Sequence, residues 1–317
     1  MARYLVSRLA VVIPVVLVVL LITFTLGYYA PGDPILIIYG EDLYRLRPED
    51  LARMRRNLGL DRPFWEQYLD YMGRTVRGDL GRSIASKVPV NRLLASSLPI
   101  SLQLGLLAGA VLALLGIPLG VLAALRHNTL LDYLIVSLAL VVRSVPVFVL
   151  APLLLILLVL QLKIMDVPAA WKGIATPAVV LPVILLAAYP LADVIRQTRA
   201  GVLEVLQEDY VRTARAKGLT LILIITRHVL RNALIPVVTS LGLIVNGLIH
   251  GSVYLDRIFN IPGFGNLVVT GIQRLDFPVI LGTTVFSALL VIAANLVVDL
   301  IYPFLDPRVT YTEREGR

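Results

Sequence analysis

The stretch LAVVIPVVLVVLLITFTLGYY, Leu9–Tyr29, decides the fold class. Its apolar residues follow one another without the alternation of a strand. A helix needs on the order of 20 such residues to cross a bilayer core about 30 Å thick. A membrane barrel would show short alternating segments instead. Similar runs of Leu, Val, Ile and Ala recur along the chain, so the sequence predicts an all-α integral membrane protein.

The composition supports a membrane location. The chain has 317 residues, of which 58% are hydrophobic and only 16% are charged. Its mean hydropathy of +0.84 would leave a soluble protein with large exposed apolar patches. The net charge is +8, but the basic residues cluster beside apolar runs, which is typical of membrane topology rather than nucleic-acid binding. The chain contains no cysteine, which excludes disulfides, thiolate metal sites and a cysteine nucleophile.

Six apolar runs are long enough to span the membrane. We predict spans at residues 6–28, 98–125, 132–162, 174–196, 231–256 and 279–303. The first run is longer than a typical signal-peptide core and lacks an A-x-A cleavage pattern, so we expect a retained anchor helix. The chain thus divides into an N-terminal anchor (1–30), a lobe (31–97), a core (98–305) that includes the segment 202–231, and a tail (306–317).

The basic residues set the orientation. Residues 196–231 hold seven Lys or Arg against three acidic residues, and Arg3, Arg8 and Arg126 fall on the same side if the spans alternate. The positive-inside rule places that side in the cytoplasm. We therefore expect a multi-pass protein of the cell membrane with both termini cytoplasmic.

The segment 31–97 is expected to form a small extracytoplasmic helical lobe. Its eleven basic and nine acidic residues do not contradict this side, because segments longer than about 60 residues translocate regardless of charge. RPEDLARMRRNLG, Arg47–Gly59, and RPFWEQYLDYMGRTV, Arg62–Val76, each predict a helix. The aromatic residues of the second are expected to pack in a core or lie at headgroup level, rather than bind a ligand.

Several catalytic and ATP-binding patterns are absent from the sequence. It contains no G-x-x-x-x-G-K-[ST] phosphate loop, no H-E-x-x-H and no G-x-S-x-G. An intramembrane enzyme would need a nucleophile and a base at matching depth. An ion-driven carrier or stand-alone channel would need carboxylates deep in the membrane. Asp193 and Asp299 are the nearest candidates, and we expect each to pair with Arg196 or to lie at the interface.

Three polar residues inside predicted spans are candidates for a translocation path. Arg143 lies within the third span, where a lipid-facing Arg costs about 2.5 to 3.5 kcal/mol. It must therefore face protein or water, and the alternative to path lining is structural pairing with a carboxylate. Asn246 and His250 lie one turn apart on the fifth span, where hydrogen bonds between helices are the alternative.

Between the fourth and fifth spans, GVLEVLQEDYVRTARAKGL, Gly201–Leu219, predicts one short amphipathic helix. Gly218 predicts a turn after it. Such a helix either lies on lipid or docks in a groove of a cytoplasmic partner.

Here the chain resembles a known family. EDYVRTARAKGL, Glu208–Leu219, followed by RHVLRNALIPVVTSLG, Arg227–Gly242, is similar to the cytoplasmic signature of permease subunits of ATP-binding-cassette importers, in the dipeptide, oligopeptide and nickel branch. The resemblance covers nearly the whole chain, because four further stretches agree: Arg8–Pro34, Leu58–Ile84, Arg257–Gly282 and Asn295–Val309.

The resemblance implies a function and a set of partners. Such a permease pairs with a second, related permease, two cytoplasmic ATPases bind below, and an extracytoplasmic solute-binding protein delivers cargo. The chain itself would hold no cofactor, and the partner subunits would bind ATP and Mg and hydrolyse the ATP. Small peptides are the expected cargo, and oligosaccharides or nickel chelates are the alternatives.

The resemblance also assigns the cytoplasmic signature to a coupling helix that seats in the ATPase. Carried over residue by residue, the expected contact set is Glu208, Asp209, Arg212, Ala214, Ala216, Lys217 and Gly218. Two features depart from the family pattern. LTLILII, Leu219–Ile225, replaces a polar turn, and we expect it to lie at the interface or pack on neighbouring spans. Arg143 stands where a small or apolar residue is expected before S-x-P-x-F.

Overall fold

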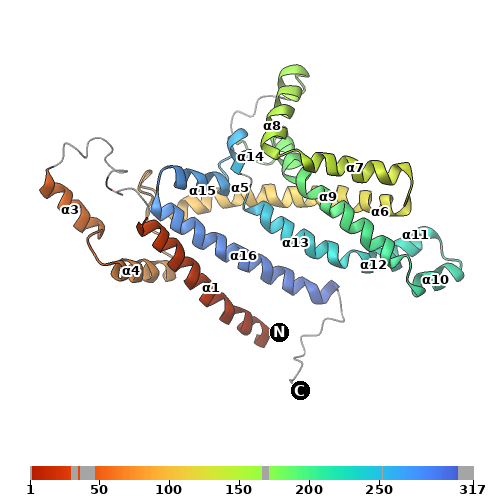
Figure 1. Cartoon of the computed structure of the whole chain (residues 1–317), viewed down its shortest axis with the longest axis horizontal. Coiled ribbons are helices and arrows are strands. Elements are labelled where there is room, and N and C mark those ends of the chain that lie inside the picture. Colours follow the sequence, from red (N-terminus) through yellow and green to blue (C-terminus); the bar gives the residue numbers. More distant parts are fainter. Residues whose placement is uncertain (1, 30–34, 36–46, 166–170, 252, 306–317) are drawn as a thin grey trace. The chain divides into compact units, whose positions relative to one another are not determined.

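The computed structural model describes residues 2–29, 35, 47–165, 171–251 and 253–305. Nearly all of these residues are helical, and an isolated bridge between Arg82 and Pro89 is the only β-pairing among them. The all-α class is therefore confirmed (Figure 1). The chain divides into two compact units, residues 1–99 with 263–293, and residues 100–262 with 294–317.

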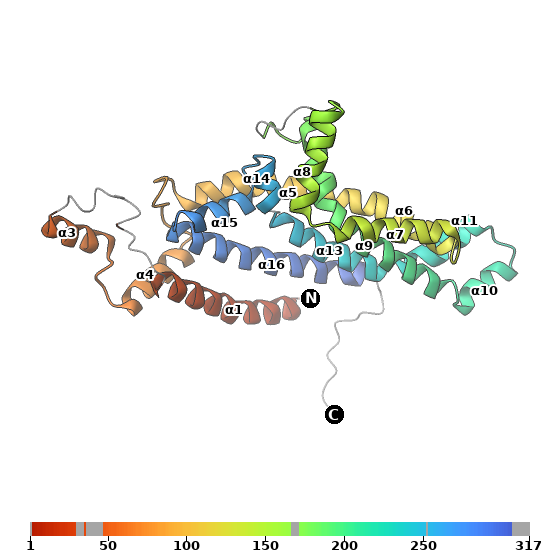
Figure 2. The same cartoon turned by 45° about the horizontal axis from the view of Figure 1, so that its top comes forward.

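The first unit combines the N-terminal helix with the lobe. Its helices are α1 (Ala2–Tyr29), α3 (Pro48–Leu58), α4 (Phe64–Val76), α15 (Phe264–Gln273), the start of α5 (Val90–Val111) and the start of α16 (Phe277–Leu305). The two lobe helices lie where the sequence predicts them. In both Figure 1 and Figure 2, α1 runs beside α16.

The core of this unit joins α1, α4 and α16. Leu20, Tyr71 and Leu281 are buried together, and Phe24 packs against them. The ring of Phe24 stacks on Tyr71 with the centroids 5.6 Å apart. Of the α4 aromatics, Tyr68 and Tyr71 are buried, which confirms core packing for these two residues. Burial raises the pKa of the Tyr71 phenol, because the charged phenolate is disfavoured away from water.

A carboxylate fixes the end of the lobe. Asp276 is buried and accepts hydrogen bonds from Ser83 Oγ at 2.5 Å, Ile84 N at 3.0 Å and Ala85 N at 3.1 Å. The turn before α16 is thereby joined to the loop before α5. Three donors on one buried carboxylate satisfy a charge that would otherwise be costly to bury.

The second unit is a helical bundle around α9. Its elements are the rest of α5, η2 (Leu112–Gly116), α6 (Ile117–Leu125), α7 (Leu130–Ser144), α8 (Val147–Leu155), η3 (Ile156–Gln161), η4 (Pro177–Val179), α9 (Val180–Val205), α10 (Asp209–Ala216), α11 (Leu221–Leu223), η5 (Ile224–Val229), α12 (Leu230–Ala233), α13 (Ile235–Ile249), α14 (Val253–Ile258) and the end of α16. The core is aliphatic, with Leu112, Leu185 and Val237 fully buried. α6 and α7 pack beside α9 (Figure 1).

Close packing of α6 on α9 depends on Gly120. A Cβ at this position would lie 2.5 Å from Thr198 Cβ and 2.7 Å from the carbonyl oxygen of Ile195. With Gly116, Gly120 forms a G-x-x-x-G pattern, which allows membrane helices to approach closely.

Among the described residues, three helical stretches are long and apolar enough to span a membrane, Val90–Leu125, Pro177–Val205 and Phe277–Val297. Two bent pairs bring the number to five if each is one span. The first pair, Leu130–Ser144 with Val147–Gln161, bends by 96°. The bend lies just before Pro146, which cannot donate a backbone hydrogen bond. As a result, α8 projects away from α7 in Figure 2. In α1 the apolar stretch found in the structure, Ile13–Tyr29, is shorter than the spans named above. The sixth span, and with it the total of six, therefore stays a prediction.

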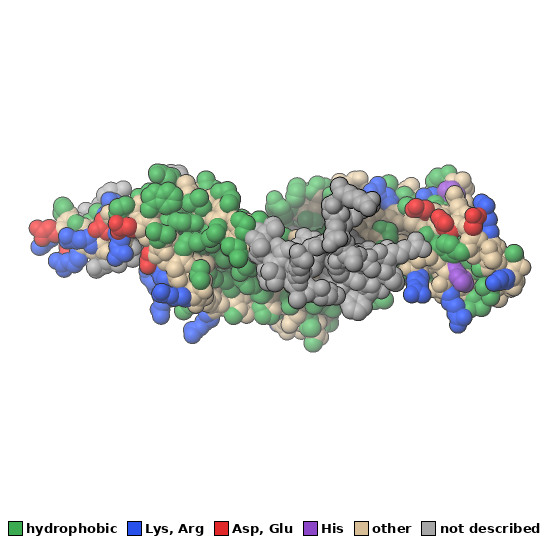
Figure 3. Space-filling view, turned by 90° about the horizontal axis from the view of Figure 1, so that it is seen from below, with side chains coloured by type: hydrophobic (Ala, Val, Ile, Leu, Met, Phe, Trp, Pro, Cys, Tyr) green, Lys and Arg blue, Asp and Glu red, His purple; other side chains and the backbone are tan. Residues whose placement is uncertain are grey.

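The fifth predicted span differs from the structure. We predicted residues 231–256, but the second bent pair is Leu221–Ala233 with Ile235–Ile249, with a bend of 55°. The helical region thus begins ten residues earlier, at the apolar residues of LTLILII, and α13 ends before the left-handed Gly251. Hydrophobic side chains cover broad areas of the described surface, and charged side chains gather in separate groups (Figure 3).

Candidate functional site

The candidate site is the short helix α10, together with the elements that hold it. α9 ends at Val205, and two residues lead to Glu208, whose extended backbone (φ −67°, ψ 145°) precedes α10. Asp209 lies in the first turn of α10 and Arg215 in the last, where each charge is favourable to the helix dipole. Gly218 has φ +78°, a conformation that glycine adopts without strain.

The single amphipathic helix predicted for Gly201–Leu219 is wrong, because the structure divides it. The backbone leaves the helix at Leu206–Glu208 and starts again at Asp209. The apolar spacing of the sequence continues through this break, which explains the error. The break separates the bundle helix α9 from α10.

α10 has one buried face. Val211 and Ala214 are buried in a cluster with Val202 and Val205 of α9, Ile224 and Val229 of η5, and Ala233 of α12. Ala214 therefore contacts this chain, and its side chain is not open to a partner. The other predicted contact residues are exposed, and they are Glu208, Asp209, Arg212, Ala216, Lys217 and Gly218.

Tyr210 connects α10 to the following helices, a role that sequence reasoning missed. Its hydroxyl oxygen accepts a hydrogen bond from Asn232 Nδ2 at 2.8 Å, and the same amide donates to the carbonyl of His228 at 3.3 Å. Asp209 and Arg212 form an ion pair at 3.3 Å, but both side chains are largely exposed, so this pair adds little stability.

LTLILII has two different surroundings. Ile224 and Ile225 are buried, and Ile224 packs in the cluster under α10, whereas Leu221 and Ile222 are exposed. Packing on neighbouring helices is thus observed for its second half. The exposed half leaves apolar surface beside α10.

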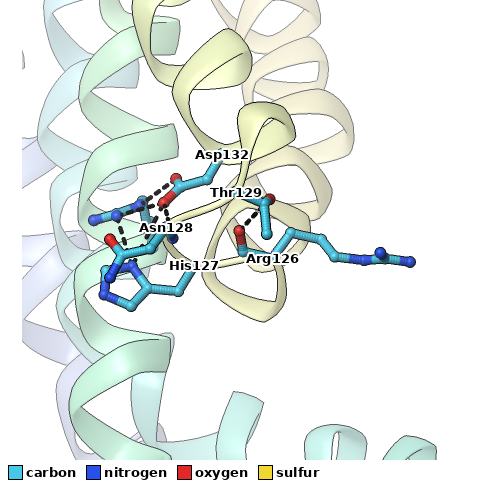
Figure 4. A network of polar contacts seen from close by, with 6 residues as sticks. Arg126, His127, Asn128, Thr129 and Asp132 are labelled. Atoms are coloured by element: carbon cyan, nitrogen blue, oxygen red, sulfur yellow. Dashed lines mark hydrogen bonds and ion pairs between the residues drawn. The ribbon is translucent and has the colours of Figure 1, made fainter.

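A buried charge network lies where α6, α7 and α9 meet (Figure 4). Asp132 accepts bonds from Arg199 Nε and Nη2, both at 2.7 Å, and from Asn128 N at 3.1 Å. His127 Nδ1 lies 3.0 Å from Arg199 Nη2 and 3.5 Å from Asp132 Oδ2. The side chain of Asp132 is only 2% exposed. A bidentate pair of this kind fixes both distance and orientation.

This network joins the loop before α7 to α9, six residues before α9 ends. Neither Asp132 nor Arg199 was singled out from the sequence. Asp132 lies three residues after Thr129 at a helix start, so its local pattern indicates only a role in capping that helix. Nothing in this pattern indicates its partner Arg199, which is 67 residues away.

Arg143 pairs with a carboxylate of its own chain. It donates a hydrogen bond to Asp193 of α9, and its guanidinium lies 5.0 Å from the ring centroid of Tyr189. Asp193 also pairs with Arg196 at 3.3 Å, as we expected. Structural pairing, the alternative given for Arg143, is therefore present in this structure. About a quarter of each of the paired Arg143 and Asp193 side chains stays exposed.

Asn246 and His250 lie together on α13. The ring Nδ1 of His250 is 2.9 Å from the carbonyl oxygen of Asn246. Asn246 Oδ1 is buried and has no hydrogen-bond partner among the described residues. The described residues contain no cluster of three metal-ligating side chains.

Comparisons with known proteins place the chain in a family. Residues 116–311 match the family described as the binding-protein-dependent transport system inner membrane component, and residues 1–105 match its N-terminal counterpart. The dipeptide transport system permease protein DppB of Escherichia coli (strain K12) is 38% identical over 98% of this chain and 99% of that protein. The protein of the same name from Bacillus subtilis (strain 168) is 40% identical over 98% of this chain and 98% of that protein. A putative peptide transport system permease protein of Brucella abortus (strain 2308) is 38% identical over 98% of this chain and its full length.

Two solved structures share the fold. An amino acid ABC transporter solved with histidines aligns with a TM-score of 0.51 at 19% identity, over 68% of this chain and 94% of that chain. The methionine transporter MetNI in inward-facing conformations aligns with a TM-score of 0.50 at 18% identity, over 66% and 96%. At this identity the likeness concerns the fold alone. The two family matches and the nearly full-length relatives carry the assignment, and the chain belongs to the inner-membrane permease components of binding-protein-dependent ABC importers.

Proposed function

We propose that the chain is one of two permease subunits that together form the path for small peptides into the cell. The names of relatives at 38 to 40% identity support peptides as cargo. The second permease, two cytoplasmic ATP-binding subunits and an extracytoplasmic solute-binding protein complete the importer. Oligosaccharides and nickel chelates stay as alternatives, and calorimetric titration of the solute-binding protein with peptides and sugars would separate them.

We further propose that α10 is the coupling helix. The observation that carries this proposal is the division of α10 into a face packed on α9 and η5 and a face of exposed charged and small residues. A helix held on one side by its own bundle moves with that bundle, so a force on the exposed face reaches α9. Six of the seven predicted contact residues are exposed. Ala214 instead lies on the buried face and packs against the bundle.

The network of Asp132 and Arg199 would extend this connection. It joins α9 to α7 just above the break that leads to α10, so that a displacement of α10 moves α9 and α7 together. In the proposed topology this end of the bundle and both termini face the cytoplasm, because the Lys and Arg excess of residues 196–231 lies there. ATP binding switches the paired permeases only if it favours one of their two states.

A bulky side chain on the exposed face tests the proposal. Ala216→Trp should block ATPase docking, because Ala216 is exposed at the end of α10. Ala52→Trp, at an exposed position of the lobe helix α3, is the matched control. We expect co-purification of the ATP-binding subunits to fall with Ala216→Trp alone. Equal recovery with both variants would contradict a docking role for α10.

A further inference from the structure

The first unit contains a cavity of about 630 Å³, within the range of about 300 to 1,000 Å³ that is typical of small-molecule sites. Its walls come from α1, the two lobe helices, the loop before α5 and the start of α16. The proposed coupling function does not use it. Its lining residues divide into an apolar part and a cationic part.

The apolar part comes from membrane-type helices. Phe24 of α1 and Phe277 and Leu281 of α16 line the cavity, and Phe24 belongs to the aromatic cluster with Tyr28 and Tyr71. Aromatic clusters at the ends of spans are typical of the headgroup level of a bilayer. This cluster suits the level at which lipid headgroups meet acyl chains.

The cationic part comes from the lobe. Four arginines line the cavity, Arg55, Arg62, Arg74 and Arg82, against two carboxylates, Asp70 and Asp79. Both carboxylates are engaged, because Asp70 pairs with Arg74 at 2.9 Å and Asp79 accepts a bond from Gly81 N at 2.9 Å. Within the described part of the chain, Arg62 and Arg82 have no ion pair. Among the described lining residues, arginines thus outnumber carboxylates by two.

The outer side of α4 also favours a lipid neighbour. Trp65, Leu69 and Val76 are exposed at spacings of four and seven residues, which places them on one face of the helix. The adjoining side packs Phe64 and Tyr68 on Phe24 of α1. A helix with an exposed apolar stripe and Trp at one end is suited to lie in the membrane interface.

From these observations we propose that the cavity binds the phosphate headgroup of an anionic phospholipid, with its acyl chains along Phe24, Phe277 and Leu281. Arg62 and Arg82 supply the charge that selects an anionic over a zwitterionic lipid. The lipid fills the space between the lobe and the ends of α1 and α16, and steadies the lobe on the membrane surface.

Native mass spectrometry of the purified full chain, titrated with phosphatidylglycerol or phosphatidylethanolamine, tests the proposal. We expect phosphatidylglycerol to bind more tightly. The double substitution Arg62→Gln with Arg82→Gln should weaken its binding about 30-fold, equivalent to about 2 kcal/mol. Arg62→Lys with Arg82→Lys keeps the charge and should lose far less. Arg56→Gln with Arg77→Gln removes the same charge from exposed lobe positions outside the cavity and should change binding by less than about threefold.

Four results would overturn the proposal. The two lipids could bind equally, or the two glutamine pairs could have equal effects. Glycerol phosphate could compete as well as the intact lipid, which would identify a phosphate-ester site without a role for acyl chains. Finally, the Arg62 and Arg82 pair could weaken capture of the solute-binding protein while lipid binding stays unchanged, which would identify a protein-docking surface. Because transport is not measured, none of these results depends on the peptide cargo.

Discussion

Replacing Asp132 by Ala should destabilise the helical bundle more than any surface change of the same kind. The carboxylate is 2% exposed and accepts two bonds from Arg199 at 2.7 Å and one from Asn128 N at 3.1 Å. Removing one partner of a buried pair costs about 3 to 5 kcal/mol. Arg199 retains 26% exposure, so water can partly solvate its guanidinium, and we expect a loss of about 2 to 3 kcal/mol.

Asp209→Ala is the control, because it removes the carboxylate of an ion pair on the surface of α10 with 72% and 95% exposed side chains. It should cost at most about 1 kcal/mol. The free energy of unfolding is measured by titration with sodium dodecyl sulfate in mixed micelles. A double-mutant cycle with Arg199→Leu should give a coupling energy of about 2 kcal/mol. A loss for Asp132→Ala no larger than for Asp209→Ala would refute the reasoning.

Three further substitutions probe other parts of the structure. Gly120→Ala should lower the free energy of unfolding by about 1 to 3 kcal/mol, because the new Cβ meets Thr198 and the Ile195 carbonyl. Gly247→Ala should leave the free energy of unfolding nearly unchanged, because the new Cβ would have no atom of another element within 4 Å. Equal losses for the two variants would contradict the packing argument. Asp276→Ala leaves Ser83 Oγ, Ile84 N and Ala85 N without their acceptor, so hydrogen exchange should accelerate at Ile84 and Ala85, and unchanged protection would disprove the role of Asp276. Arg143→Asp and Asp193→Arg should each lower the free energy of unfolding, because each places two like charges side by side. The double swap should recover at least half of that loss, and no recovery would contradict a role for the pair.

Much of the fold can be predicted from the sequence because the membrane limits the choices. Continuous apolar runs predict helices, and α3 and α4 follow from Pro48, Gly59 and the aromatic spacing. The break before α10 could not be predicted, since Val202, Leu206 and Tyr210 keep a helical spacing of four residues through it. The break is visible only in the packing of Val211 and Ala214 on η5.

The candidate site at α10 was likewise only partly predictable from the sequence. The exposed charges of α10 follow from a local motif, but the contacts that hold the helix depend on distant residues. Arg199 meets Asp132 across 67 positions, and Asn232 meets Tyr210 across 22. Periodicity and motif spacing report neighbours along the chain, so these pairs need the three-dimensional structure. Arg143 was recognised as unusual from its depth, and its partner Asp193 was considered only with Arg196.

The central claim, that the exposed face of α10 docks on the ATP-binding subunits, can be tested directly because the chain has no cysteine. Single substitutions Ala216→Cys on α10 and Ala52→Cys on α3 each introduce one exposed thiol. The rate of labelling with a maleimide is then measured for the permease with and without its ATP-binding subunits. The account predicts that the subunits slow labelling at position 216 at least tenfold and leave position 52 unchanged. Equal rates at position 216 with and without the subunits would contradict it.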